Sequence, residues 1–172
     1  MNLDKETTCL LLIDIQKDYQ NVSHFPEFRQ NIRKCLKWAR KEKIKICHVF
    51  EIDNQHSHWI RVWEEMNGKR IRDKGQPFPF SKPRQNEKTI IKHGYDAFFE
   101  TPLHDYLQKN KIKSLYVCGL LTGVCVLNSI FSAFNHGYQI TVIGNCCSDR
   151  TKDRHQRTLK NYKDYLFRLT NI

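Results

Sequence analysis

The chain has 172 residues, 40% of them hydrophobic, and its 29 Lys and Arg against 18 Asp and Glu give a net charge of +11 at pH 7. This size and apolar content suit one domain over residues 1–172 with a full core. No apolar run approaches the roughly 20 residues of a membrane-spanning helix, and the apolar stretch near the start is too short for a signal peptide. We therefore expect a soluble cytoplasmic protein with no membrane partner.

Strand and helix patterns alternate along the chain. Residues 8–14 form a continuous apolar run closed by a carboxylate, as in a strand buried on both faces. A helix is predicted over residues 26–43, where proline stands near the first turn and apolar residues share one stripe. Further strands are predicted at 44–50, 89–92, 114–118 and 138–144, and further helices at 101–109, 123–135 and 152–167. This alternation predicts an α/β fold, a three-layer, Rossmann-like open sheet of mainly parallel strands with helices on both faces.

The segment between the second and third predicted strands, residues 51–88, is too long for a plain connection. Long loops in compact domains are usually functional or disordered. This one contains four aromatic residues that favour folding, namely Trp59, Trp63, Phe78 and Phe80. We expect a folded excursion that covers a site.

The basic residues are dispersed over residues 29–45, 69–92 and 150–168 and form no zinc-finger spacing or unbroken basic arm. Nucleic acid is therefore not expected as the main partner. Seven cysteines are an odd number and none is spaced as CxxC, so reduced thiols are the simplest interpretation. They are Cys9, Cys35, Cys47, Cys118, Cys125, Cys146 and Cys147. Most of them are expected to pack in the core as small hydrophobic residues.

One cysteine has a distinctive position. An apolar run ends at Gly119, the chain turns, and Cys125 stands at a helix-like beginning. The first amides of a helix lack internal partners and carry the positive end of the helix dipole, so they favour a thiolate. The position predicts a nucleophilic thiol with a lowered pKa.

Polar residues close several of the predicted strands. Asp14 and Lys92 end the first and third strands, Cys125 follows the fourth, and Asn145 and Ser148 follow the fifth. Because ligands bind beyond the carboxyl ends of parallel strands, we expect these side chains in one crevice. A carboxylate, an ammonium and a thiol together are typical of nucleophilic catalysis, with a base, a charge stabiliser and a nucleophile.

Each of the three main residues also has an ordinary structural interpretation. Asp14 is equally suited to capping the turn after its strand, and Lys92 to lying solvated in a basic loop. Cys125 is suited to packing its helix against the sheet. Only their joint occurrence favours the catalytic interpretation.

Three ordered segments carry a more specific pattern. In LLLIDIQKDY an aspartate is followed by a glutamine and an acidic–aromatic pair, namely Asp14, Gln16, Asp18 and Tyr19. KHGYDAFFETPL begins with Lys92, and GLLTGVCV places a threonine three residues before Cys125, with GNCCSD and His155 further on. These motifs resemble those of the isochorismatase-like cysteine hydrolases, a family that includes the nicotinamidases, and the resemblance covers nearly the whole chain.

The resemblance implies a mechanism and a site. Asp14 would accept the proton of Cys125, whose thiolate would attack an acyl carbon, while Lys92 would stabilise the charges. The amides of Leu121 and Cys125 would form an oxyanion hole, and the peptide between Leu120 and Leu121 would be cis. Asp14 would then activate water to hydrolyse the thioester without a cofactor. Relatives are commonly dimers or tetramers, so we expect a homo-oligomer.

Metal binding divides this family. Its nicotinamidases bind a metal through an aspartate with a histidine two residues later and further histidines, after the second strand. Here the corresponding segment offers Glu51, Asp53, His56 and His58, but the aspartate-to-histidine spacing is three. Asp53, His56 and His58 are therefore weak metal candidates, and we expect no metal and surface positions for both histidines.

The segment instead resembles metal-free members of the family, in which it covers the site and shapes substrate choice. We assign Tyr19, Trp59, Trp63 and Thr122 to the substrate pocket, with ordinary lid packing as the alternative for the two tryptophans. The leading hypothesis is a cysteine hydrolase acting on a small amide or a related carbon–nitrogen substrate. Two alternatives stay open: a binding protein without turnover that recruits an acidic partner, and a nicotinamidase with an atypical metal site.

Overall fold

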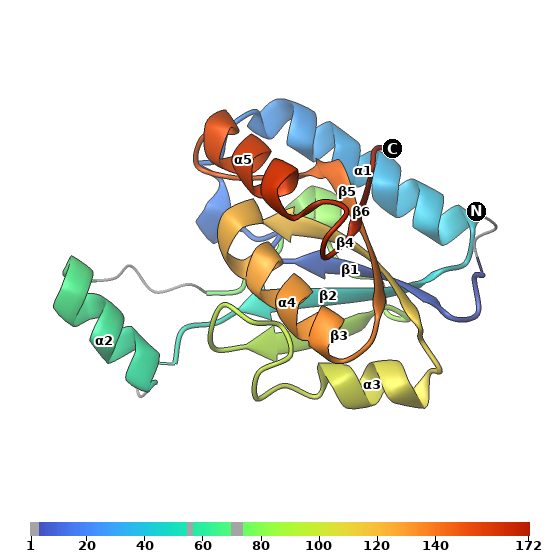
Figure 1. Ribbon diagram of the computed structural model, residues 1–172, viewed down its shortest axis with the longest axis horizontal. Helices are drawn as coiled ribbons and strands as arrows, with labels where there is room; N and C mark the ends of the chain where they lie inside the picture. Colours follow the sequence, from blue (N-terminus) through green and yellow to red (C-terminus); the bar gives the residue numbers. More distant parts are fainter. Residues whose placement is uncertain (1–3, 55–56, 70–73) are drawn as a thin grey trace.

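The protein folds around a six-stranded sheet with strand order β3-β2-β1-β4-β5-β6, in which neighbouring strands run parallel (Figure 1). The computed structural model describes residues 4–54, 57–69 and 74–172. The strands are β1 (Thr8–Ile13), β2 (Lys45–Glu51), β3 (Lys88–Lys92), β4 (Ser114–Leu120), β5 (Gln139–Ser148) and β6 (Arg168–Thr170). The α-helices are α1 (Phe25–Lys41), α2 (His58–Asn67), α3 (Leu103–Lys109), α4 (Leu127–Asn135) and α5 (Lys152–Tyr162). Short 3₁₀ turns occur at Lys17–Tyr19 and Pro79–Ser81, and a π-helical turn at Thr122–Val126.

The core lies on both sides of the sheet. β1 is buried along its whole length because β2 and β4 flank it and helices cover the sheet. In Figure 1 the strands lie between α1 and α3. α1 turns one apolar stripe inward, made of Phe28, Ile32, Cys35, Leu36 and Ala39. The predicted α/β sheet with helices on both faces is confirmed.

The end of the chain differs from the prediction. A helix to residue 167 is wrong, since α5 ends at Tyr162 and the chain turns at Asp164, which has a positive φ of 65°. Leu166 and Phe167 are buried in the core after this turn, and the chain then forms β6 at the sheet edge. The prediction placed Leu159, Tyr162 and Leu166 on one helical face, but only Leu159 and Tyr162 lie on α5, and Leu166 packs in the core beyond the turn.

The carboxyl ends of β4 and β5 are also longer than predicted. The register between these strands shifts after Val117, so that Leu120 pairs with Ser148. Gly119 has a φ of 138°, and a Cβ atom there would lie 2.0 Å from the carbonyl oxygen of Ile13. Only glycine therefore allows β4 to approach β1 this closely. The close approach brings the end of β4 beside Asp14, the residue that follows β1.

The described residues between β2 and β3 form α2 and the 3₁₀ turn at Pro79–Ser81. α2 stands apart from the sheet at the left of Figure 1, while Lys74 and Pro77 form bridges with Ile52 and Gln16. Phe78 is buried, with its ring centroid 5.1 Å from that of Phe25 and 5.0 Å from that of Phe80. Aromatic packing thus anchors the far end of the excursion. Among the described residues, none of the helices is long and apolar enough to cross a membrane.

Candidate active site

Three strands deliver Asp14, Lys92 and Cys125 to one buried cluster at the carboxyl edge of the sheet. Lys92 Nζ lies 2.8 Å from Asp14 Oδ2, and the side chains of both residues are 0% exposed. Cys125 is 1% exposed and sits in the π-helical turn that follows β4. The three side chains predicted to share one crevice thus lie together. Their burial excludes bulk water, which strengthens every electrostatic interaction among them.

A fourth residue, Glu51, completes the cluster. Its Oε2 accepts hydrogen bonds from Lys92 Nζ at 2.9 Å, from the Tyr19 hydroxyl at 3.0 Å and from Cys125 Sγ at 3.5 Å. The Gln16 side chain holds the Glu51 backbone on both sides, accepting from its amide at 2.9 Å and donating to its carbonyl at 3.0 Å. From sequence, Glu51 was predicted only as a possible metal ligand. Its place at the end of a buried strand is the signal that could have added it to the catalytic set.

The backbone of Asp14 directs its carboxylate. Asp14 has a φ of 51°, in the left-handed region, and its amide donates to the carbonyl of Val49 at 2.9 Å. Such a conformation is uncommon outside glycine and concentrates at functional sites. Neither carboxylate oxygen has a hydrogen-bond partner of regular geometry among the described residues, so the contact with Lys92 is an ion pair. Asp14 thus retains acceptor capacity for a proton.

The charges of this cluster do not cancel. Two carboxylates face one ammonium, so the ionised cluster carries a net negative charge. Burial raises the pKa of Asp14 from its ordinary 3.8 to about 7, with Lys92 opposing the rise and Glu51 adding to it. Burial alone would lower the pKa of Lys92, but Asp14, Cys125 and Glu51 together raise it above its ordinary value. Lys92 is therefore a permanent cation, while Asp14 titrates near neutral pH.

Cys125 rests as a thiol. Burial raises its pKa well above the ordinary value, Asp14 and Glu51 raise it further, and Lys92 only partly compensates. The expectation of a lowered pKa at a helix start is wrong for this resting site, because two nearby carboxylates and the loss of hydration disfavour the thiolate. A thiol in this state must lose its proton before it can act as a nucleophile, and a carboxylate oxygen of Asp14 lies within 4.8 Å of Cys125 Sγ.

The turn Thr122–Val126, which carries Cys125, contacts α5 and the loop before it. The peptide between Leu120 and Leu121 is cis, the configuration that the family resemblance implies. Thr122 Oγ1 lies 2.8 Å from His155 Nδ1, and the amide of Gly123 donates to Asp149 Oδ2 at 2.8 Å. Thr122, assigned from sequence to the substrate pocket, is buried, and its hydroxyl lies against His155 of α5.

Of the other residues assigned from sequence to the substrate pocket, one contacts the cluster directly and two lie on α2. Tyr19 touches the cluster through Glu51. Trp59 donates from its indole nitrogen to the carbonyl of His93, directly after Lys92, and its ring lies 5.1 Å from that of Tyr95. Trp63 is one turn further along α2.

Two residues predicted to join the crevice do not. Asn145 and Ser148 lie inside β5, which runs four residues beyond its predicted end. The Asn145 side chain donates to the carbonyl of Ile172 at 2.7 Å, and the Ser148 hydroxyl donates to the carbonyl of Ser23 at 2.6 Å. Because of the register shift between β4 and β5, the side chains of Asn145 and Ser148 bond to backbone carbonyls and do not join the cluster.

Among the described residues, Asp53 and His58 belong to no cluster of three metal-ligating side chains. His56 lies outside the described residues, Asp53 is half-buried, and exposed His58 has its Nδ1 engaged by Arg61 at 2.6 Å. The metal-ligating atoms that converge within 4.8 Å in the described part of the chain belong to Asp14, Glu51 and Cys125. The Lys92 ammonium already bonds both of these carboxylates, so it supplies the cation that a metal would bring.

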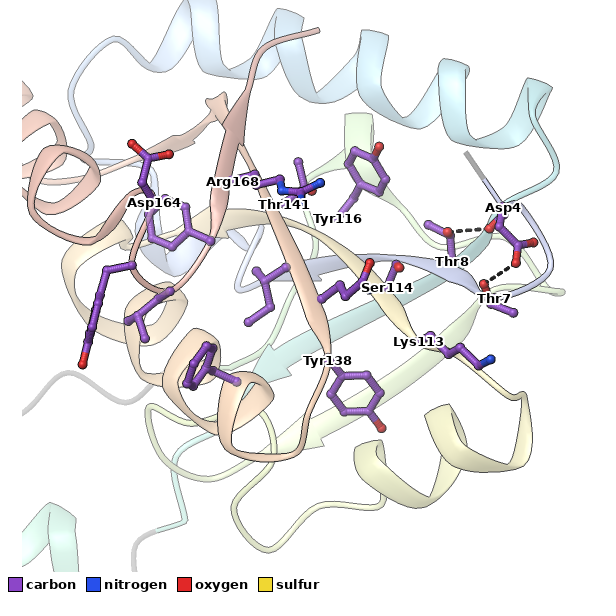
Figure 2. A pocket seen from close by; sticks show the side chains of 16 residues that line it. Asp4, Thr7, Thr8, Lys113, Ser114, Tyr116, Tyr138, Thr141, Asp164 and Arg168 are labelled. Carbon is purple, nitrogen blue, oxygen red and sulfur yellow. Dashed lines mark hydrogen bonds between the residues drawn. The ribbon is translucent and has the colours of Figure 1, made fainter. Parts of the chain in front are cut away.

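A large cavity lies away from this cluster. It measures about 690 Å³ and opens at the amino-terminal ends of β4 and β5, where Lys113, Tyr138 and Arg168 contribute to its lining (Figure 2). Its lining includes none of the four cluster residues. Chemistry, and not cavity size, therefore identifies the candidate active site.

Comparisons with known proteins agree with this fold and these motifs. The isochorismatase domain model matches residues 8–172. YddQ of Bacillus subtilis, an uncharacterized isochorismatase family protein, is 31% identical over 151 residues, covering 84% of this chain and 79% of that protein. The ureidoacrylate amidohydrolase RutB of Acinetobacter baylyi is 22% identical over 197 residues, covering 96% and 80%. An isochorismatase crystal structure from Pseudomonas putida superimposes with a TM-score of 0.82 at 25% identity, over 99% of this chain and 91% of that one. The chain therefore belongs to the isochorismatase family.

Proposed function

We propose that the protein hydrolyses a small amide, or a related carbon–nitrogen bond, through a thioester formed on Cys125. The observation that carries this proposal is the buried contact of Lys92 with Asp14 and Glu51, beside the Cys125 thiol. Family membership supports hydrolase chemistry, and the name of RutB supports an amide as the bond attacked.

In the first half-reaction, Asp14 accepts the Sγ proton as Sγ bonds to the acyl carbon. The carbon–nitrogen bond then breaks, and Asp14 returns the proton to the leaving nitrogen. In the second half-reaction Asp14 takes a proton from water, which attacks the thioester and releases the acid and the thiol. A pKa of about 7 suits Asp14 both to accepting a proton and to returning it, since an acid–base catalyst works best when its pKa is near the operating pH.

Lys92 and Glu51 set the electrostatic environment of Asp14 and Cys125. Lys92 stabilises the thiolate as it forms, because the ammonium is already held beside it by two carboxylates. Glu51 keeps Lys92 in position and, as a neighbouring negative charge, raises the basicity of Asp14. The amides of Leu121 and Cys125 are our candidates for the oxyanion hole. No step needs a redox cofactor.

The substrate pocket is proposed to use Tyr19 and Thr122 near the cluster and Trp59 and Trp63 on α2. Tyr19 has the strongest support, because its hydroxyl bonds the carboxylate that also meets Cys125. We further propose a single-domain cytoplasmic enzyme that works as a homo-oligomer.

The test is a turnover screen of small amides, ureides and isochorismate with the wild-type protein and Cys125→Ala. For any substrate that is cleaved, rapid acid quenching and peptide mass spectrometry should find the acyl group on the Cys125 peptide. Cys118→Ala is the matched control, since Cys118 is a buried thiol in the preceding strand. Turnover that survives Cys125→Ala, or no turnover with any of these compounds, would reject the proposal.

A further inference from the structure

A buried carboxylate outside the catalytic cluster binds the backbone of the turn Thr122–Val126, which carries Cys125 and is called the nucleophile turn below. Asp149 directly follows β5, whose last residue, Ser148, pairs with Leu120 at the end of β4. Its side chain is 0% exposed, and its Oδ2 accepts the amide of Gly123 at 2.8 Å. Gly123 is only two residues before Cys125. The strand pairing thus delivers Asp149 to the backbone that carries the nucleophile.

The other contacts of Asp149 fix its orientation. Its Oδ1 accepts the amide of Arg150 at 2.8 Å and lies 3.5 Å from Arg154 Nε. Its carbonyl accepts the amide of Ser23 at 2.8 Å, so the segment that leads into α1 braces the same residue. With one carboxylate oxygen held by its own loop, the other is directed at Gly123. A charge-assisted bond of this kind is roughly twice as strong as a neutral one.

Position 123 leaves little room for a side chain beside this contact. A Cβ atom there would lie 3.2 Å from Asp149 Oδ2 and 2.9 Å from Thr158 Oγ1 on α5. The neighbouring residue of the turn is attached to the same helix, through the bond between Thr122 and His155. Two consecutive residues of the nucleophile turn are therefore held by the α5 region, one by its side chain and one by its amide.

We propose that Asp149 is a positioning residue that fixes the nucleophile turn, so that Cys125 Sγ faces Asp14. The proposal rests on the function proposed above. Asp149 acts through geometry, because the charges that affect the Cys125 thiol come from Asp14, Glu51 and Lys92. A reacting sulfur displaced by about 1 Å loses on the order of 100-fold in rate.

The first test is steady-state turnover of Asp149→Ala, Asp149→Asn and the control Asp153→Asn. Asp153 is exposed in the first turn of α5 and pairs with Arg157. Asp149→Ala should lower kcat by about 10- to 100-fold with little change in KM. Asp149→Asn should lose less than about tenfold, because its amide oxygen can still accept from Gly123. Equal kcat in Asp149→Ala and Asp153→Asn would overturn the proposal.

The second test needs no substrate turnover. Alkylation of Cys125 by iodoacetamide is followed against pH by peptide mapping, with the other six thiols as internal controls. In Asp149→Ala the released turn should move the Cys125 midpoint down toward about 8.5, the value of an ordinary thiol. The midpoint should stay at its wild-type position in Asp153→Asn. An unchanged midpoint in Asp149→Ala would refute the positioning role.

These two readouts separate the proposals. If the wild-type protein cleaves none of the amides, the proposed function fails, while the alkylation midpoint still decides the role of Asp149. If Asp149→Ala does not fold, Gly123→Ala takes its place, because the added methyl group displaces the same contact from the other side. It should give the same loss of kcat and the same shift of midpoint, and wild-type values for both would overturn the proposal.

Discussion

Replacing Asp14 by Asn should make the protein more stable at pH 8 while removing its activity. The pKa of Asp14 rises from 3.8 to about 7 on folding, mainly through burial. At about 1.36 kcal/mol for each pKa unit, ionising this carboxyl in the folded state costs up to about 4 kcal/mol. Because neighbouring groups relax, we expect a gain of roughly 2–4 kcal/mol in the free energy of unfolding at pH 8. Asn also tolerates the left-handed backbone found at position 14.

The sign of the effect follows from proton uptake. Between about pH 4 and 7 the folded protein keeps a proton on Asp14 that the unfolded chain has lost, so this group's contribution falls as pH rises. The contribution is complete below pH 3.8 and lost above about pH 7. In the variant Lys92 still pairs with Glu51, so no buried charge is left alone.

The assay is urea unfolding followed by tryptophan fluorescence at pH 4.5 and pH 8. The difference between Asp14→Asn and the wild type should be small at pH 4.5 and large at pH 8. Asp105→Asn, at an exposed position on α3, is the control and should show no such difference. If the difference in the free energy of unfolding between Asp14→Asn and the wild type is the same at both pH values, the ionisation of Asp14 does not destabilise the folded protein and the argument is refuted.

Three further substitutions test the other members of the cluster. Lys92→Met should lower the free energy of unfolding at pH 8 by about 3–5 kcal/mol, because two buried carboxylates lose their cation; urea unfolding that matches the wild type would contradict this. Glu51→Gln should shift the acid limb of the kcat/KM profile to lower pH, since Glu51 raises the pKa of Asp14, and an unmoved limb would exclude that coupling. Cys125→Ser should reduce turnover by at least about 10³-fold with an unchanged Tm, and residual activity near the wild-type level would exclude Cys125 as nucleophile.

Much of the site was predictable because parallel strands end at a common edge. Asp14 and Lys92 close strands whose apolar runs are easily identified, and Cys125 follows a third. Their convergence then depends only on sheet topology. Glu51 was harder to assign, because a carboxylate at the end of a strand can equally well be exposed to solvent. Only its tertiary partners, such as Lys92, show that it is buried in the cluster.

The missed features depend on tertiary register. β6 is only three residues long, too short for an alternating pattern, and its neighbours Leu166 and Phe167 imitate a helical stripe. The shift between β4 and β5 turns Asn145 and Ser148 away from the crevice, and no local pattern marks it. The raised pKa of Cys125 likewise comes first from burial and then from two acids that are distant in sequence.

The close backbone approach of Gly119 to Ile13 makes the fold and the proposed site depend on the same residue. Any side chain at position 119 would force β4 away from β1 at the point where Asp14 begins. A substitution at this codon would therefore disturb the fold together with the proposed site, whereas substitutions at positions 14, 92 or 125 would leave this contact between the strands intact. Relatives that keep the fold without activity should therefore retain glycine here and differ instead at positions 14, 92 or 125.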